Sequence, residues 1–355
     1  MKHAPLVSVV TPVYNGEAYL VECIESVLSQ SYPNWEFIIV NNCSTDKTLE
    51  IAQSYAARDA RIRVHTNAHF APIIENHNLA VRQISSESKY CKVVFADDWL
   101  FPECISEMVK VAEANPSVGL VGAYGLEGAQ VVWDGLPYPS TFVMGRDLCR
   151  WTLSGRPYIF GTPTSLLMRS DLVRSRKALY DETNLHADHA ACYDLLQESD
   201  FGFVHQVLTY SRTRPESNHT FAKSMDSTIL GDFSILFKYG PVYLTPVEQR
   251  ARLDSLLDVY YQRLAQSFVR LRAKDYWKYH RDRLDAIGLR ISRARLVAAI
   301  IKKAVTSLAH PGNSVTRALQ YWPVRFKTIR DRGTQPENLA AHGPAAEQQR
   351  RSVVS

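Results

Sequence analysis

The 355-residue sequence has no long apolar run. Its longest uninterrupted apolar stretch, Leu296 to Ile301, stops at Lys302-Lys303, far short of the ~20 residues that a transmembrane helix needs. The β-branched run from Leu6 to Val10 is ended by Thr11-Pro12, too early for the apolar region of a secretory signal. We therefore expect a chain that starts in the cytoplasm without a membrane anchor of its own.

Paired cysteines are also absent. The six cysteines are scattered with no C-x-x-C pair, which is typical of reduced thiols rather than of a disulfide framework or a zinc site. The composition is 46% apolar and 22% charged, which excludes collagen-like and wholly disordered chains. The length suggests one large domain or two.

Charge is unevenly distributed along the chain. Residues 1–262 hold 22 Lys and Arg against 30 Asp and Glu, whereas residues 263–355 hold 19 against 6. The two parts therefore have different roles. An acidic main body argues against a protein that binds nucleic acid, because basic residues would then line its principal surface.

The first third of the sequence alternates short β-branched runs with helical patterns. Strands are predicted at 6–13, 35–40, 62–65 and 90–96, with helices between them. This alternation predicts an α/β fold, in which helices flank a mostly parallel sheet connected by right-handed crossovers. We expect this domain to span residues 1–224, followed by a basic helical region at 225–332 and a disordered tail at 333–355.

Polar clusters follow three of the predicted strands. They are Thr11–Glu17, Asn41–Asp46 and Asp97-Asp98. Each has a structural interpretation, respectively a turn, a helix N-cap and a solvated loop. Ligands of open parallel sheets bind beyond the carboxyl ends of the strands, however, so three clusters at one edge favour a binding site.

The adjacent carboxylates Asp97 and Asp98 would repel each other without a cation nearby. A site with few protein ligands, all of them oxygen, suits Mg²⁺ or Mn²⁺ shared with the phosphates of a substrate. A nucleotide diphosphate leaving group would supply those phosphates.

Three segments together resemble the family 2 glycosyltransferases of the GT-A (Rossmann-like) fold, and the resemblance covers residues 5–215. They are Val7–Gly16 (VSVVTPVYNG), Val40–Asp46 (VNNCSTD) and Phe95–Leu100 (FADDWL). The resemblance implies transfer of a sugar from a nucleotide diphosphate sugar, with a divalent cation as cofactor. The donor-binding positions that it implies are Thr11, Pro12, Tyr14, Glu17, Asn42, Asn76 and Asp97, and the metal positions are Asp97 and Asp98.

Two departures from the family pattern bear on the donor. Many members carry Asp-Asp-Gly-Ser where this chain has Asn41-Asn42-Cys43-Ser44, although the oxygen of Asn42 can still accept a hydrogen bond from uracil. Many also have an aspartate at the position of Phe95, so the cation depends on Asp97 and Asp98. Either of the two could be the direct ligand.

The resemblance also implies an acidic base for the acceptor hydroxyl at the start of a late helix, where this chain has Asp188. Asp188 could instead cap that helix. His186 and His189 beside it converge poorly for a metal site. The turn Gly161–Thr164 resembles the acceptor side of the family site or is a plain strand entry. Arg212 and Arg214 either clamp the leaving diphosphate or lie solvated at a strand end.

We therefore predict an inverting glycosyltransferase that uses a nucleotide diphosphate sugar, preferably UDP-linked, and a glycan or lipid-linked acceptor. A regulatory module that binds nucleotide sugars without catalysis is the alternative. A sugar nucleotidyltransferase fits less well, because the loop at Gly16 has no further glycine and no Lys or Arg. The basic region from Arg290 to Arg332 either docks on anionic membrane at the cytoplasmic face or packs on protein, including a second subunit.

Overall fold

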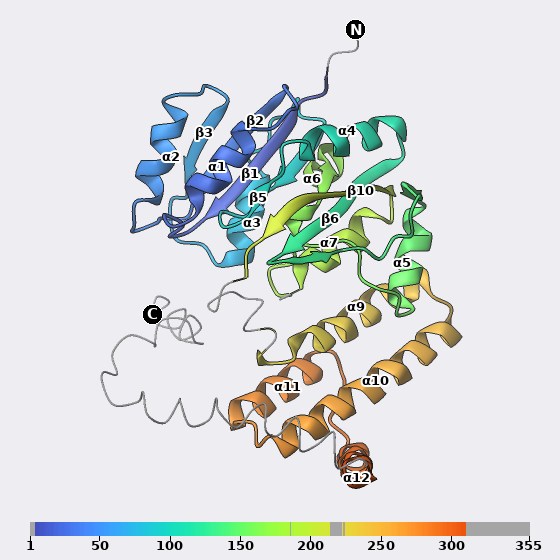
Figure 1. Ribbon diagram of the computed structural model, residues 1–355. Coiled ribbons are helices and arrows are strands. Elements are labelled where there is room, and N and C mark those ends of the chain that lie inside the picture. Colours follow the sequence, from blue (N-terminus) through green and yellow to red (C-terminus); the bar gives the residue numbers. More distant parts are fainter. Residues whose placement is uncertain (1–3, 185, 214–221, 223, 310–355) are drawn as a thin grey trace, which may run out of the picture. The chain divides into compact units, whose positions relative to one another are not determined.

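The computed structural model describes residues 4–184, 186–213, 222 and 224–309 (Figure 1). The predicted α/β class is confirmed, because a central sheet is flanked by helices and followed by a helical carboxyl-terminal part. Two compact units divide the chain. The larger comprises Met1–Tyr260 with Arg272–Ile291, and the smaller comprises Tyr261–Leu271 with the segment from Ser292 onward.

The amino-terminal half of the sheet is parallel and has the order β3-β2-β1-β4. Its strands are β1 (Val7–Val13), β2 (Trp35–Asn41), β3 (Ile62–Thr66) and β4 (Tyr90–Val93). The connecting helices are α1 (Leu20–Leu28), α2 (Thr48–Ala56) and α3 (Ile73–Val81). All seven residues of β1 are buried, as expected for a strand covered on both faces.

The carboxyl-terminal half of the sheet has the order β9-β6-β10-β5 and mixed direction. Its strands are β5 (Trp99–Leu100), β6 (Val118–Glu127), β9 (Leu167–Arg169) and β10 (Asp200–Ser211), with β7 (Gln130–Val132) and β8 (Phe142–Val143) added at the side. Strand β9 runs antiparallel to both β4 and β6, whereas β10 runs parallel to β6. The predicted parallel arrangement thus holds for the first half only, because apolar patterning does not encode strand direction.

Helices cover the sheet and form the rest of the chain. In the larger unit they are α4 (Cys104–Ala114), α5 (Gly145–Leu153), the 3₁₀ turn η1 (Pro163–Ser165), α6 (Ser170–Arg174) and α7 (Ala187–Leu195). The helices after residue 225 are α9 (Ser227–Tyr243), α10 (Pro246–Val269), α11 (Lys274–Ala286) and α12 (Arg293–Ala309). Among the helices that the structure describes, none combines the length and apolar character needed to cross a membrane.

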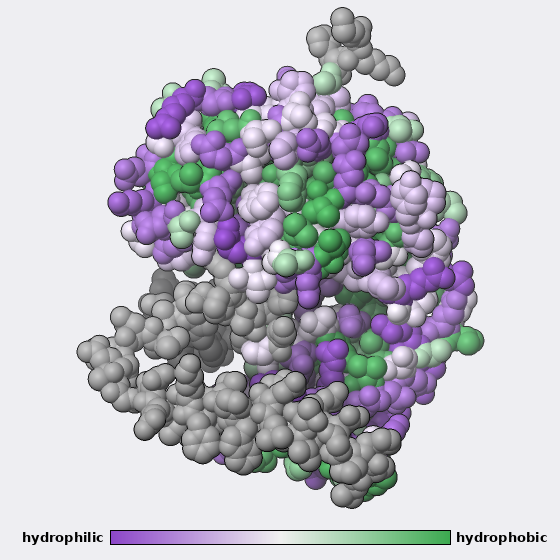
Figure 2. Space-filling view, viewed as in Figure 1, coloured by the Kyte–Doolittle hydropathy of each residue, from purple (hydrophilic) through white to green (hydrophobic). Residues whose placement is uncertain are grey.

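The core of the larger unit lies between β1, β2, β4 and the helices packed on them. Val9, Ile24 and Phe37 are fully buried there, and the visible surface mixes hydrophilic and hydrophobic residues (Figure 2). Strand β4 ends at Val93, three residues before the predicted end. The chain then turns toward η1, because the Phe95 N–H donates to the Thr164 hydroxyl at 3.1 Å. That turn places the following acidic residues at the carboxyl edge of the sheet.

Candidate active site

The loops after β1 and β2 hold each other in place. The Gly16 N–H donates to the Thr48 hydroxyl at 2.8 Å, and the Glu17 N–H donates to the Asp46 carboxylate at 3.0 Å. In return the Glu17 carboxylate accepts from the Lys47 N–H at 2.9 Å. Asp46 also accepts from the N–H of Thr48, the first residue of α2, although the N-cap residue of that helix is Lys47, whose side chain makes no capping hydrogen bond.

The residues predicted on the donor side of β1 lie at different depths. Thr11 and Pro12 are buried within the strand, and the Thr11 hydroxyl donates to the Val94 carbonyl at 2.8 Å. Tyr14 is 42% exposed and meets Phe70 edge to face with ring centroids 4.9 Å apart. Of these predicted positions, Tyr14 is the one with a side chain open to a ligand.

A buried amide cluster follows β2 and β3. The Asn42 oxygen accepts from the Asn67 amide and from the Ala71 N–H, both at 2.9 Å, and the Asn42 amide donates to the Ala71 carbonyl. The Asn67 amide also donates to the Asn76 oxygen at 2.9 Å. The uracil N–H that was predicted to donate to the Asn42 oxygen would therefore compete with the Asn67 amide and the Ala71 N–H. One amide hydrogen of Asn42 remains for a ligand.

Asn67 belongs to this cluster, although it was not among the predicted site residues. It is 6% exposed, and its side-chain oxygen has no hydrogen-bond partner among the described residues. The signal was available, because Asn67 directly follows β3 at the carboxyl edge where the other clusters lie.

The acidic pair follows β4, and its two members differ in environment. Asp97 is partly exposed, whereas Asp98 is 4% exposed. The Thr164 hydroxyl donates to Asp98 at 2.7 Å and the Arg212 N–H donates to it at 3.0 Å. Burial nevertheless raises the pKa of Asp98 to about 7, and the charge of Asp97 adds to the rise. Asp98 is thus a buried carboxylate that is costly to ionise, and a nearby cation would lower that cost.

Arg212 lies directly beside the acidic pair. Its Nε donates to the Asp97 carbonyl at 3.1 Å, and its guanidinium pairs with the Glu22 carboxylate. The guanidinium also stacks 4.4 Å from the Tyr19 ring centroid. Arg212 is therefore an anchored residue rather than a solvated strand end, while Arg214 lies outside the described residues.

His77 on α3 contacts the acidic loop and lies near the predicted base. Its ring stacks on Phe95 with centroids 5.0 Å apart, and Tyr180 lies 6.0 Å from it on another side. Burial lowers the pKa of His77 to about 4, although the charge of Asp188 opposes this shift. The imidazole is therefore neutral at pH 7 and lies within the electrostatic reach of Asp188.

Asp188 lies in the first turn of α7, one residue after the helix begins. The N-cap residue is His186, so Asp188 does not occupy the cap position. Its carboxylate is partly exposed and has no hydrogen bond or ion pair within the described part of the chain. The neighbouring His189 stacks on Tyr158 with centroids 4.1 Å apart, and the charge of Asp188 adds to the effect of burial in raising the pKa of Tyr158. A carboxylate without a protein partner can accept a proton from a ligand.

The sequence model of glycosyl transferase family 2 matches residues 8–174, a range that contains β1, the amide cluster and the acidic pair. This chain carries a family 2 glycosyltransferase domain. It is 34% identical over 173 residues to the putative glycosyltransferase EpsE of Bacillus subtilis, covering 46% of this chain and 60% of EpsE. An uncharacterized glycosyltransferase of Haemophilus influenzae is 28% identical over 201 residues, or 53% of this chain. The chain thus spans 59% and 60% of these curated relatives.

Two solved glycosyltransferase structures share the fold. Staphylococcus aureus TarS in complex with UDP-GlcNAc has a TM-score of 0.59 and 16% identity, covering 84% of this chain and 89% of TarS. The mannosyltransferase PcManGT of Pyrobaculum calidifontis, in complex with GDP-Man and Mn²⁺, has a TM-score of 0.52 and 15% identity, covering 85% and 87%. These likenesses support the GT-A architecture.

The carboxylates of this glycosyltransferase domain fit a divalent cation that is shared with a substrate. No group of three or more His, Cys, Asp or Glu that could enclose a metal occurs among the described residues. Mg²⁺ and Mn²⁺ sites that include substrate phosphates need only one or two carboxylates. Asp97 and Asp98 supply two adjacent carboxylates, one partly exposed and one buried. The donor set therefore fits a cation that binds together with a diphosphate.

Thr164 was predicted as part of an acceptor wall or of a plain turn, and it has a further contact. Its hydroxyl accepts from the Phe95 N–H and donates to Asp98, so it connects η1 to the acidic loop. Its carbonyl accepts from the fully buried Lys92 ammonium. No periodicity or motif indicated this connection, because it joins segments 66 residues apart.

Proposed function

We propose that this chain is an inverting, divalent-cation-dependent glycosyltransferase. Its donor would be a nucleoside diphosphate sugar, preferably UDP-linked, and its acceptor a hydroxyl of a glycan or lipid-linked molecule. The arrangement that carries this proposal centres on His77, which stacks on Phe95 close in sequence to the acidic pair and lies within the electrostatic reach of Asp188. The structural likeness to TarS with UDP-GlcNAc and to PcManGT with GDP-Man and Mn²⁺ supports a nucleotide-sugar donor and a cation.

On the donor side, Asp97 would face the cation directly, because Asp98 is buried and hydrogen-bonded to Thr164 and Arg212. The bound cation would supply charge stabilisation for the departing diphosphate. Asp98 would hold the loop in place. Tyr14 would offer a ring to the nucleoside, and the remaining amide hydrogen of Asn42 could reach the base.

The other predicted donor residues would act mainly through position. Thr11, Pro12 and Asn76 are buried next to the loops that would contact the donor, and Glu17 anchors the loop after β2. We propose that these residues shape the donor pocket. We also keep residue 224 as the proposed boundary between the catalytic domain and the helical region.

On the acceptor side, Asp188 would take the proton of the acceptor hydroxyl. The acceptor oxygen would then form a bond to the anomeric carbon as the bond from that carbon to the phosphate oxygen breaks. The diphosphate would leave with the electron pair. A single displacement of this kind inverts the configuration of the sugar.

A thermal-shift titration tests the donor side. The melting temperature is measured with UDP-GlcNAc, UDP-glucose and GDP-Man, each with Mn²⁺ or with chelator, because a ligand that binds the native state raises it. We expect a cation-dependent rise with one of the donors and its loss in Asp97→Ala. Asp171→Ala is the matched control, since Asp171 pairs with Arg169 away from the site. Asp97→Ala and Asp98→Ala variants that both transfer sugar at the wild-type rate in excess chelator would refute the cation site.

Product analysis separates the enzyme from the regulatory module. Phe95 stands where many family members carry a carboxylate, and it packs on His77 instead of facing a cation. A protein that binds the donor with Mn²⁺ but forms neither glycoside nor free sugar from a radiolabelled donor would be the binding module. Release of labelled sugar to acceptor or to water supports the enzyme.

The smaller unit carries features of a membrane-docking surface. Val297, Ile301 and Val305 recur every four residues along α12 and are 54–59% exposed, and apolar residues are visible at the lower edge of Figure 2 where Figure 1 places α12. Lys302 and Lys303 lie within the same helix. We propose that this face contacts anionic lipid, at about 1 kcal/mol for each basic residue near the surface. The remaining predicted elements of this surface lie outside the described residues, namely Arg317, Tyr321, Trp322, Arg325, Phe326, Lys327 and Arg330.

Liposome flotation tests this surface in the full chain. Anionic vesicles should carry the wild type at low salt, and Ile301→Glu should reduce the floated fraction. Val247→Glu, at a still more exposed position on α10, should not. Absence of flotation combined with a dimer in solution would instead assign the face to a second subunit.

A further inference from the structure

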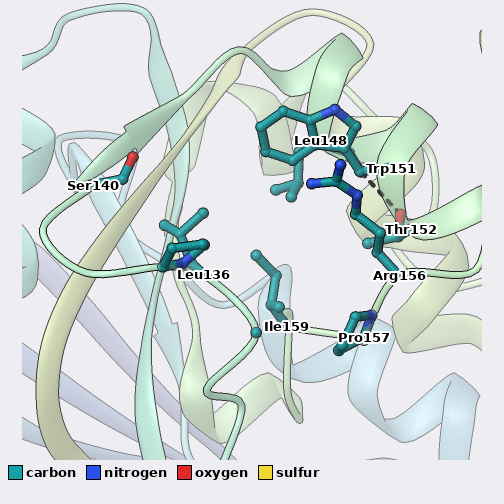
Figure 3. Close-up of a pocket in the computed structure, with 10 residues that line it drawn as sticks. Leu136, Ser140, Leu148, Trp151, Thr152, Arg156, Pro157 and Ile159 are labelled. Carbon is teal, nitrogen blue, oxygen red and sulfur yellow. Dashed lines mark hydrogen bonds between the residues drawn. The ribbon is translucent and has the colours of Figure 1, made fainter.

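A cavity of about 200 Å³ lies in the larger unit between α5 and the loops on either side of it. In Figure 3, Leu136 and Ser140 lie on one side, Trp151 and Arg156 on the other, and Pro157 and Ile159 below. The lining is mostly apolar. No predicted donor, metal or base residue lines it, so the function proposed above leaves this cavity unassigned.

The polar character of the cavity comes mainly from Arg156. Its guanidinium stacks over Trp151 at 4.9 Å from the ring centroid, and it has no carboxylate partner within the described part of the chain. Stacking fixes the plane of a guanidinium and leaves its N–H edges available for a carboxylate or a phosphate. The Thr152 hydroxyl, in contrast, is already bonded to the Leu148 carbonyl and to the Tyr193 hydroxyl.

A second cation lies close to Arg156. The Arg252 guanidinium on α10 packs against Gly155, so closely that a Cβ there would come within 2.7 Å of it. The nearby Arg150 is neutralised by its ion pair with Glu248. Arg156 in the lining and Arg252 beside the adjoining Gly155 therefore bring two guanidinium groups close to the cavity.

The segment 157–159, which lines the cavity, also contacts the helix that carries the proposed base. Pro157 and Ile159 line the cavity and flank Tyr158, whose ring stacks on His189 beside Asp188. Gly135, which also lines the cavity, packs so tightly on Ile159 that a Cβ would come within 2.2 Å of its side chain. A molecule held in the cavity would therefore lie next to the segment that supports Asp188.

We infer that the cavity binds a sugar unit of the acceptor that carries a negative charge, either a phosphate or a carboxylate. The apolar C–H face of a sugar ring would pack on Trp151, Leu136 and Ile159, and the oxyanion would accept hydrogen bonds from Arg156. Ligand sites commonly combine an apolar lining with a few polar groups in this way. This inference rests on the proposed function, because it assigns the cavity to the acceptor.

Isothermal titration of the full chain tests the inference with four probes. They are glucose 6-phosphate, methyl glucuronide, methyl glucoside and inorganic phosphate. We expect the two charged sugars to bind, and Arg156→Gln to weaken them at least about 10-fold, or 1.4 kcal/mol. Arg146→Gln is the matched control, because Arg146 is an exposed arginine on α5 that does not line the cavity. The tighter of the two charged sugars identifies the anion.

Several outcomes would overturn the inference. They are equal affinity for methyl glucoside and the charged sugars, no effect of Arg156→Gln, no binding of either charged sugar, and inorganic phosphate binding as tightly as glucose 6-phosphate. The donor thermal shift is measured on the same variants. A normal donor-induced rise in melting temperature combined with one of these outcomes refutes only the assignment of the cavity. Absence of that rise in the wild type refutes the proposed function.

Discussion

The polar side chains near the two halves of the sheet differ in their partners. Around the amino-terminal half, the side chains at the carboxyl edge bond mainly to one another, as Asn42 does to Asn67 and Ala71. Around the carboxyl-terminal half, Asp188 and Arg156 have no ion-pair partner within the described residues. The first half is therefore a preformed framework, and the second half keeps its charged groups available for a substrate.

The largest effect is expected at the available carboxylate. Asp188→Asn preserves the shape of the side chain but removes its ability to accept a proton, so we expect sugar transfer to fall about 10²- to 10⁴-fold. Donor affinity should change little, because the donor-side residues are untouched. Transfer rates and donor thermal shifts measure the two effects separately.

Asp194→Asn serves as the control for this variant. Asp194 lies on the same helix but pairs with Lys238 at 3.4 Å, so its replacement should leave transfer nearly unchanged. If Asp188→Asn kept full turnover and Asp194→Asn did not, the base would be Asp194, and the proposed contrast between paired and available carboxylates would be wrong.

The framework half should respond in stability rather than in chemistry. Asn42→Ala removes three hydrogen bonds and leaves the Ala71 N–H and carbonyl without their partner, which should cost about 2–4 kcal/mol of unfolding free energy. Urea denaturation measures this cost. Asn34→Ala, which removes one exposed hydrogen bond to the Ala4 carbonyl, should cost less than about 1 kcal/mol. Equal costs for the two variants would contradict a preformed framework.

The smallest expected effect lies at His77, where the two halves meet. The pKa of His77 in the folded state is about 4, below the ordinary value of 6.5, so the unfolded chain binds more protons between these values. Stability should therefore fall as the pH drops from 7 to 5, by about 1–2 kcal/mol from this residue. His77→Phe keeps the ring packing on Phe95 and should remove this part of the acid sensitivity. The comparison uses urea midpoints at pH 7 and pH 5.

His65→Gln is the control for the acid series, because His65 is exposed on β3. It should show the acid sensitivity of the wild type. An acid sensitivity of His77→Phe equal to that of the wild type would place the titrating groups elsewhere, with His186 and His280 next, since burial lowers the pKa of both.

The sequence predicted the amino-terminal half of the sheet well, because β1 and β2 are mostly apolar runs, each followed directly by a polar cluster. It was less informative for the second half. The antiparallel direction of the short strand β9 depends on its pairing with β4 and β6, which its own residues do not encode. The site followed the same rule. Strand ends could be found from local patterns, whereas the contacts of Thr164 and the cavity at Arg156 depend on segments distant in sequence.

The contacts of Thr164 have a consequence for exchanging parts between related enzymes. This residue bonds to Asp98, to the Phe95 N–H and to the Lys92 ammonium at once. A chimera could take residues 92–98 from a relative and keep residues 161–165 of this chain. The imported residues at 92 and 98 would then face a Thr164 that need not match them. The two segments should therefore be exchanged as one unit. A substitution of the Thr164 side chain should be compatible only with particular residues at 98, whereas the contact of Lys92 with the backbone carbonyl depends on the course of the chain.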